Sequence, residues 1–210
     1  SARPVAGVLL AAATILAAGA CTLDYKPKSR GELDTVVVML DTTRAGALDV
    51  RSALEETFGR PIPTVPGYEP TYRLLVETVP DEAALNRIKE RKNILLVAPI
   101  DEMSNPGSLI RSMLPDSLEE RVRQDQSFAF PLQDLWARDQ YVLLLSAQSP
   151  ERLAELIREQ GVGLSNRLLA SELQRREGEV FEKGEQTSLS DSLMGRFGWS
   201  VRMQHDYVWT

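Results

Sequence analysis

The chain has 210 residues, of which 43% are hydrophobic and 26% are charged, and its formal net charge is −6. This composition is that of a globular protein with a buried core, and the length suits one domain or one domain with part of another. The acidic balance argues against a nucleic-acid partner, because such proteins present a basic face. The single cysteine, Cys21, excludes an intramolecular disulfide.

The N-terminal segment has the pattern of an export signal. Residues 4–20 carry no charge, follow Arg3 and end in small residues immediately before Cys21. A positive start, a short apolar middle and a small-residue end are typical of a secretory signal, whereas a transmembrane helix needs about 20 strongly apolar residues. We therefore predict a signal peptide over residues 1–20. Its removal takes away the charge of Arg3 and changes the net charge from −6 to −7.

The end of this segment, Ala18-Gly19-Ala20-Cys21, resembles the lipobox of bacterial lipoproteins. The resemblance implies a diacylglyceryl group on the Cys21 thiol, cleavage before Cys21 and acylation of the new amine. Two or more acyl chains give stable membrane attachment. The residue after Cys21 is Thr22. In enterobacteria an Asp at this position retains a lipoprotein at the inner membrane, so by analogy the outer membrane is favoured. The alternatives are an ordinary signal peptide or an uncleaved anchor helix.

The next elements alternate between strand and helix. Residues 21–32 are polar and contain Pro27 and Gly31, which predicts a tether. Residues 36–40 form an apolar, β-branched run that predicts a buried strand. A helix is expected over residues 50–58, with Asp41, Thr42 and Thr43 as candidate N-caps. The proline-rich residues 61–70 are expected to be extended and irregular.

The alternation continues through the middle of the chain. We predict strands over residues 72–79, 94–97 and 141–145. Helices are expected to begin at Pro80-Asp81, Ser104, Pro115-Asp116 and Ser149-Pro150. Residues 128–136 are expected to be a connection. Gly161 and Gly163 are expected to break or kink the last helix, since each costs about 1 kcal/mol there.

Four strand–helix units with apolar strands predict an α/β fold, with alternating strands and helices forming a layered mixed sheet. The alternative is an α+β two-layer sandwich, with helices mainly on one face. The predicted domain spans residues 33–176. Residues 177–210 are expected to be a loop, from 177 to 192, and the start of a further β-containing segment, with strands at 199–203 and 207–210. We expect this C-terminal part to be truncated, with more chain after Thr210.

Several short stretches resemble a family of uncharacterised lipoproteins of Bacteroidota, domain of unknown function 4837. The stretches span most of residues 33–210 and are Val36-Val37-Val38-Met39 with Asp41 and Gly46, Pro61-Ile62-Pro63-Thr64-Val65-Pro66-Gly67 with Glu69-Pro70, Arg91-Lys92-Asn93-Ile94-Leu95-Leu96-Val97, Trp136-Ala137-Arg138-Asp139-Gln140 and Asp206-Tyr207-Val208-Trp209. The chain departs from the family at Arg44, where Trp is common, and at Asp139, where Pro is common. The resemblance implies an outer-envelope lipoprotein and supplies no activity.

The sequence predicts no catalytic site, no metal site and no cofactor. The one histidine, His205, stands beside Asp206 and is interpreted as a surface residue. With one His and one Cys in the chain, the common zinc sites lack their ligands, and a Ser-His-Asp triad would have to use His205. No phosphate-binding glycine loop follows a strand. Asp41 follows a strand, where α/β proteins often bind ligands, although helix capping explains it. The remaining candidates are acids that could form a glycosidase pair: Glu69, Glu77, Asp101, Glu102 and Asp134.

Trp136 and Arg138 form a candidate binding patch, because Trp and Arg are enriched in binding hot spots. The alternative is a packed Trp136 with a solvated Arg138. The sequence thus predicts an envelope lipoprotein that binds a protein or glycan partner without catalysis. Its rivals are a hydrolase of envelope polymers with paired carboxylates, and a structural subunit of an outer-membrane assembly.

Overall fold

The fold is built on one mixed five-stranded sheet. The computed structural model describes residues 25–78 and 81–208, so the predicted signal peptide and Cys21 lie outside the described residues. The strand order is β4-β1-β5-β7-β6, in which four strands are parallel and β6 runs antiparallel to β7. The strands are β1 (Thr35–Met39), β4 (Arg73–Glu77), β5 (Asn93–Val97), β6 (Ala129–Gln133) and β7 (Tyr141–Leu145).

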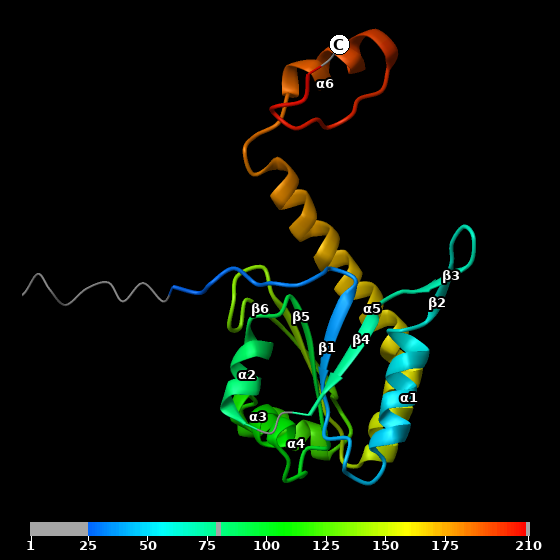
Figure 1. The fold of residues 1–210 in the computed structure, drawn as a ribbon, viewed down its shortest axis with the longest axis vertical. Helices are drawn as coiled ribbons and strands as arrows, with labels where there is room; N and C mark the ends of the chain where they lie inside the picture. The colour runs from blue at the N-terminus through cyan, green and yellow to red at the C-terminus, as the bar shows by residue number, and fades with distance from the viewer. Residues whose placement is uncertain (1–24, 79–80, 209–210) are drawn as a thin grey trace, which may run out of the picture.

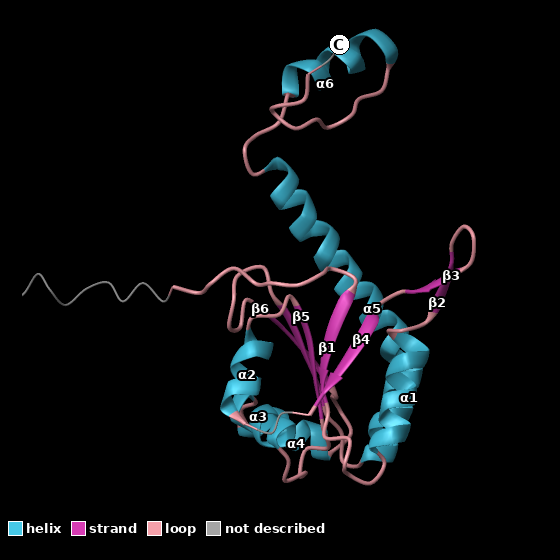
Figure 2. Ribbon diagram, in the orientation of Figure 1, coloured by secondary structure: helices cyan, strands magenta, loops and turns pink. Residues whose placement is uncertain are grey.

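Six helices lie in the described residues, and five of them cover the sheet (Figures 1 and 2). They are α1 (Ala47–Thr57), α2 (Glu82–Lys89), α3 (Asn105–Met113), α4 (Asp116–Arg123), α5 (Pro150–Phe181) and α6 (Thr187–Phe197). The predicted starts at Ser104 and Ser149 are confirmed, since each side chain accepts a hydrogen bond from the first turn of its helix. Asp81 caps α2 in the same way.

Alternate residues of the strands face two separate cores. Val36, Val38 and Leu143 pack with α1 and α5, whereas Val37 and Leu144 pack with α2, α3 and α4. Because successive strand residues point to opposite faces, a continuous apolar strand is buried on both sides. The predicted α/β layered fold is confirmed as three layers. The two-layer alternative is wrong, because helices cover both faces.

Two β elements were expected to be irregular. Residues 128–136 contain β6, an edge strand in which Pro131 pairs with Leu143. Proline is tolerated there because an edge strand has neighbours on one side only. The proline-rich stretch forms an exposed antiparallel hairpin of β2 (Pro61–Pro63) and β3 (Tyr68–Pro70). The prolines in these two stretches therefore led to the prediction of irregular structure where the chain forms strands.

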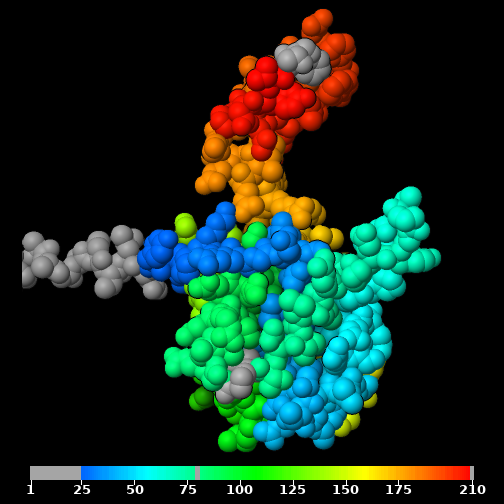
Figure 3. Space-filling view, in the orientation of Figure 1, coloured from blue at the N-terminus to red at the C-terminus, as the bar shows by residue number. Residues whose placement is uncertain are grey.

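The C-terminal predictions are wrong in two respects. Helix α5 runs unbroken through Gly161 and Gly163 to Phe181, and the end of α5 together with the start of α6 occupies most of the predicted loop at residues 177–192. Residues 199–203 and 207–208 form no strand, although Gln204 makes one bridge with Glu185. Residues 182–208, the C-terminal lobe, stand beyond the end of α5 and clear of the sheet domain in Figures 1 and 3.

The predicted tether is partly a structural element. Residues 27–30, the docked segment, run along the edge of the sheet where the parallel strands begin, which we call the amino edge (Figure 1). The Ser29 amide donates to the Arg138 carbonyl at 2.9 Å, and the Arg138 amide donates to Pro27 at 2.8 Å. The Arg30 carbonyl accepts from Lys92 at 3.0 Å. The folded domain therefore begins before residue 33.

No helix in the described part of the chain is both long enough and apolar enough to cross a bilayer.

Candidate functional site

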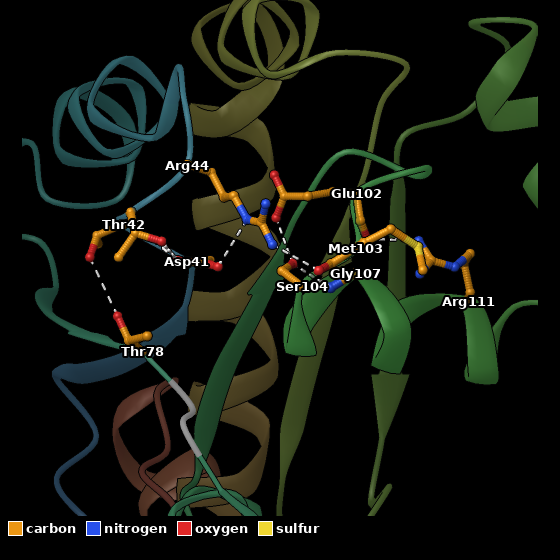
Figure 4. Close-up of polar contacts among 10 residues, drawn as sticks. Asp41, Thr42, Arg44, Thr78, Glu102, Met103, Ser104, Gly107 and Arg111 are labelled. Atoms are coloured by element: carbon orange, nitrogen blue, oxygen red, sulfur yellow. Dashed lines mark hydrogen bonds and ion pairs between the residues drawn. The ribbon is translucent and has the colours of Figure 1, made fainter.

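The sheet topology places one candidate site at the carboxyl ends of β1 and β5. From β1 the chain passes outward to β4 on one side and later returns to β5 on the other. Open α/β sheets often bind ligands at such a reversal of strand order. The residues found there follow β1, β4 and β5 and are drawn in Figure 4.

The loop after β1 is organised by Asp41, which does not cap α1. Its carboxylate accepts from the Thr43 amide at 3.1 Å, from the Thr43 hydroxyl at 2.6 Å and from Arg44 Nε at 3.2 Å. The Thr43 hydroxyl bond and, more weakly, the nearby Arg44 hold the pKa of Asp41 below its usual value. Gly46, in a left-handed conformation, precedes α1 as its N-cap residue. The predicted capping role of Asp41, Thr42 and Thr43 is therefore wrong.

The loop after β5 is tied to the same network. Arg44 Nη2 donates to the Met103 carbonyl at 2.8 Å, and Ser104 donates to Glu102 at 2.5 Å (Figure 4). Arg111 donates to the carbonyls of Ile100 and Glu102. These polar groups bond one another, so the contacts at the carboxyl edge hold the two loops together and leave these groups unavailable to a ligand.

The acids considered for a glycosidase pair do not share one site: Glu77, Asp101 and Glu102 lie toward the carboxyl edge of the sheet, and Glu69 and Asp134 lie elsewhere. Glu69 lies on the exposed hairpin and Glu77 ends β4, whereas Asp134 lies beyond β6. Asp101 pairs with Arg123 at 2.9 Å. Among the described residues no three His, Cys, Asp or Glu side chains are grouped to hold a metal ion.

A cavity of about 460 Å³ lies at the opposite, amino edge of the sheet. Its walls are the docked segment, the loop after β6 and the C-terminal half of α5. The residues that line it are Lys28, Gln133, Asp134, Arg138, Asp139, Gln140, Ser171, Gln174, Arg175, Gly178, Glu179 and Glu182. Eleven of these twelve side chains are polar, so the cavity suits a polar ligand.

The loop that forms one wall is held by the buried amide of Gln140. Its Oε1 accepts from the backbone amides of Trp136 and Ala137 at 3.0 and 3.4 Å. Its Nε2 donates to the carbonyls of Lys89 and Arg91, both at 2.7 Å. One side chain thereby satisfies four backbone groups that no strand pairing reaches. The loop is fixed before any ligand arrives.

Arg175 fixes α5 to the same loop. Its guanidinium donates to the Asp139 carbonyl at 2.8 Å and to Asn93 Oδ1 at 2.7 Å. Burial lowers its pKa, although Glu172 opposes this effect. Burial disfavours the charged form of Glu172 as well and therefore raises its pKa. The Glu172 carboxylate accepts a hydrogen bond from the Tyr72 hydroxyl at 3.1 Å. Buried polar contacts therefore position the helix that completes the cavity.

Lys28 closes the cavity from the docked segment. Its ammonium lies 2.9 Å from the Glu179 carboxylate and 3.9 Å from that of Asp139. The hydrogen bond to Glu179 raises the pKa of Lys28, and the same bond lowers the pKa of Glu179. Lys28 was missed from the sequence because a polar stretch with Pro27 and Gly31 is typical of a linker.

Five side chains in the cavity wall have no hydrogen bond or ion pair to any described residue. They are Gln133, Arg138, Ser171, Gln174 and Glu182. A guanidinium, two amides, a hydroxyl and a carboxylate are thus available to a ligand that carries carboxylate, amide, hydroxyl or amino groups.

The two residues of the predicted patch have different surroundings. Arg138 is exposed and lines the cavity. Trp136 is half-buried, packs against the core formed with α2, α3 and α4, and has Lys89 Nζ 6.0 Å from its ring centroid. Trp136 does not line the cavity. His205, in the C-terminal lobe, is exposed and lies 3.8 Å from Asp206.

A family model covers the sheet domain from the docked segment to the end of α5. It is described as Domain of unknown function (DUF8532) and matches residues 29–181. The chain belongs to this family. The DUF8532 match includes the cavity walls except Lys28 and Glu182, and the C-terminal lobe lies outside it. No curated protein and no solved structure matches the chain.

DUF8532 is a different family from the lipoprotein family that the sequence motifs resemble. That resemblance stays a prediction.

Proposed function

We propose that the chain is a lipid-anchored protein of the bacterial envelope that binds a polar envelope polymer, a glycan or its peptide, without catalysis. The supporting observation is the amino-edge cavity, whose free polar groups include the exposed guanidinium of Arg138. Envelope polymers carry the carboxylate, amide and hydroxyl groups that these side chains bind. Lipid on Cys21, in an outer membrane, would hold the cavity close to such polymers.

The position of the cavity agrees with this anchoring. Lys28 lies seven residues after Cys21, and seven residues span at most about 24 Å. Because residues 27–30 are docked on the amino edge, a lipid on Cys21 would keep that edge near the bilayer.

Binding is favoured over hydrolysis by the state of the carboxylates. A glycosidase needs one carboxyl group with a raised pKa to act as the general acid. In the cavity, Lys28 lowers the pKa of Glu179. Glu172, whose pKa is raised by burial, is 4% exposed and bonded to Tyr72, so it does not reach a ligand in the cavity.

The cavity is tested by Arg138→Ala. We expect soluble peptidoglycan fragments to bind the mature protein about tenfold more weakly, because one charge-assisted contact is worth roughly 1.4 kcal/mol or more. Calorimetric titration measures the change. Arg121→Ala, at an exposed position on α4 where the side chain has no partner among residues 25–78 and 81–208, removes the same charge and is expected to bind as the natural chain does.

Equal weakening by Arg121→Ala would mean that net charge alone drives binding. If Arg138→Ala bound the fragments as tightly as the natural chain, the cavity would not be the binding site.

A further inference from the structure

The C-terminal lobe carries an unusual share of exposed apolar surface. Six of its 27 residues are exposed large apolar side chains, whereas the 155 described residues before it carry ten. The six are Met194, Phe197, Trp199, Val201, Tyr207 and Val208. The lobe's own core is small, with Leu193 and Met203 as its buried apolar residues.

The lobe is nevertheless a fixed structure. Gln186 Nε2 donates to the carbonyls of His205 and Tyr207, and Arg202 Nε bonds the Glu185 carboxylate at 3.0 Å. The Arg202 guanidinium also lies 4.0 Å from the ring centroid of Phe181, at the end of α5. The exposed apolar side chains are therefore presented by a folded scaffold.

Two of these side chains form an aromatic pair. The rings of Phe197 and Trp199 are stacked with centroids 6.3 Å apart, and both side chains are more than half exposed. Trp and Tyr are enriched where a bilayer meets water, because each has an apolar body and a polar tip. The lobe contains Trp199 and Tyr207 among its exposed residues.

The lobe and the described part of the N-terminal segment both lie beyond the amino edge of the sheet, the segment running to the left and the lobe standing above it in Figure 1. Lys28 bonds Glu179, which stands two residues before the end of α5 at Phe181, and the lobe follows directly (Figure 1). A lipidated Cys21 would lie at most about 24 Å from Lys28 along the chain. The lobe therefore falls within reach of the bilayer that the lipid enters.

The charge of the lobe favours apolar insertion over electrostatic attraction. Lys183, Arg196 and Arg202 are set against Glu182, Glu185, Asp191 and Asp206, which gives a net charge of −1 with His205 neutral. Such a surface gains little from anionic lipids. Burial of aromatic and aliphatic side chains in the interface is the favourable contribution that remains.

We propose that the C-terminal lobe is a second membrane contact, which inserts Phe197, Trp199 and neighbouring apolar side chains into the bilayer interface. This inference rests on the proposed lipid anchor at Cys21. The occupant of the apolar surface is lipid, and the competing occupants are a second copy of the chain and any part of the protein outside residues 1–210.

The test uses the lipidated full-length mature protein in phosphatidylcholine vesicles, with or without brominated acyl chains. Trp136→Phe with Trp209→Phe leaves Trp199 as the sole tryptophan. Insertion to a depth of about 5–10 Å predicts that brominated lipid removes about half of its emission or more, with little effect of salt. The matched control keeps only Trp136, which packs on the sheet domain, and its emission is expected to be unchanged.

The outcomes separate the two proposals. Protein that floats with the vesicles but shows no quenching of Trp199 overturns the membrane contact and leaves the anchor standing. Protein that does not float overturns the anchor, and the contact that rests on it. A dimer in detergent solution whose Trp199 is already shielded from iodide assigns the surface to a second copy and also overturns the proposal.

Discussion

Replacing Gln140 by Leu is expected to lower the free energy of unfolding by at least about 3 kcal/mol. The side chains are similar in size, but Leu leaves two amides and two carbonyls of the backbone without their partner. Each buried polar group that loses its partner costs about 1–3 kcal/mol. Urea unfolding followed by circular dichroism measures the loss.

The matched control is Gln133→Leu. Gln133 is exposed on β6 and has no side-chain hydrogen bond to any described residue, so its replacement is expected to change stability by less than about 0.5 kcal/mol. If both variants unfolded at the same urea concentration as the natural chain, the buried amide would not hold the cavity loop.

Two glycines of one helix are expected to respond in opposite directions to alanine. A Cβ at Gly161 would lie 2.7 Å from Thr57 Oγ1 and 2.8 Å from Thr57 Cβ, where α1 crosses α5, whereas a Cβ at Gly163 meets nothing within 4 Å. Gly163→Ala is expected to stabilise by up to about 1 kcal/mol through helix propensity. Gly161→Ala is expected to lose about 1–3 kcal/mol from overpacking, partly offset by that gain.

Thermal unfolding of the two variants measures this difference. The Thr57→Ala variant lacks Thr57 Oγ1 and Cγ2, two of the three side-chain atoms that a Cβ at Gly161 would meet. In the Thr57→Ala background, Gly161→Ala is therefore expected to cost less stability than it costs in the natural chain. A stabilising Gly161→Ala in the natural background would contradict the close approach of the two helices.

The sheet could be predicted because its strands are short, apolar and bounded by polar residues. The strands β1, β5 and β7 are buried on both faces, and such runs have few other readings. Helix starts were found where Ser104 or Ser149 precedes a proline. These local signals depend on neighbours in the sequence, so no tertiary information was needed.

The errors arise where tertiary contacts decide. Gly161 predicts a helix break, yet the small residue lets α1 approach α5, and the packing offsets the cost of the glycine. Pro131 predicts a connection, yet an edge strand tolerates it. α6 lies in a polar stretch, and packing within the lobe buries its Leu193.

The cavity was only half visible in the sequence. Arg138 was singled out by its position beside Trp136, but its role as an exposed cavity residue depends on the loop that Gln140 holds. Lys28 and Glu179 lie 151 residues apart in the sequence and form an ion pair because the docked segment crosses the amino edge beside α5. Sequence spacing alone carries no signal of that contact.

The lipid anchor is the claim on which the proposed function most depends, and the intact mass of protein extracted from the membranes of its natural host tests it. We expect a chain that begins at Cys21 and carries a diacylglyceryl group on the thiol and an acyl group on the amine. A chain with an unmodified Cys21 thiol, or with residues 1–20 still attached, would contradict the account.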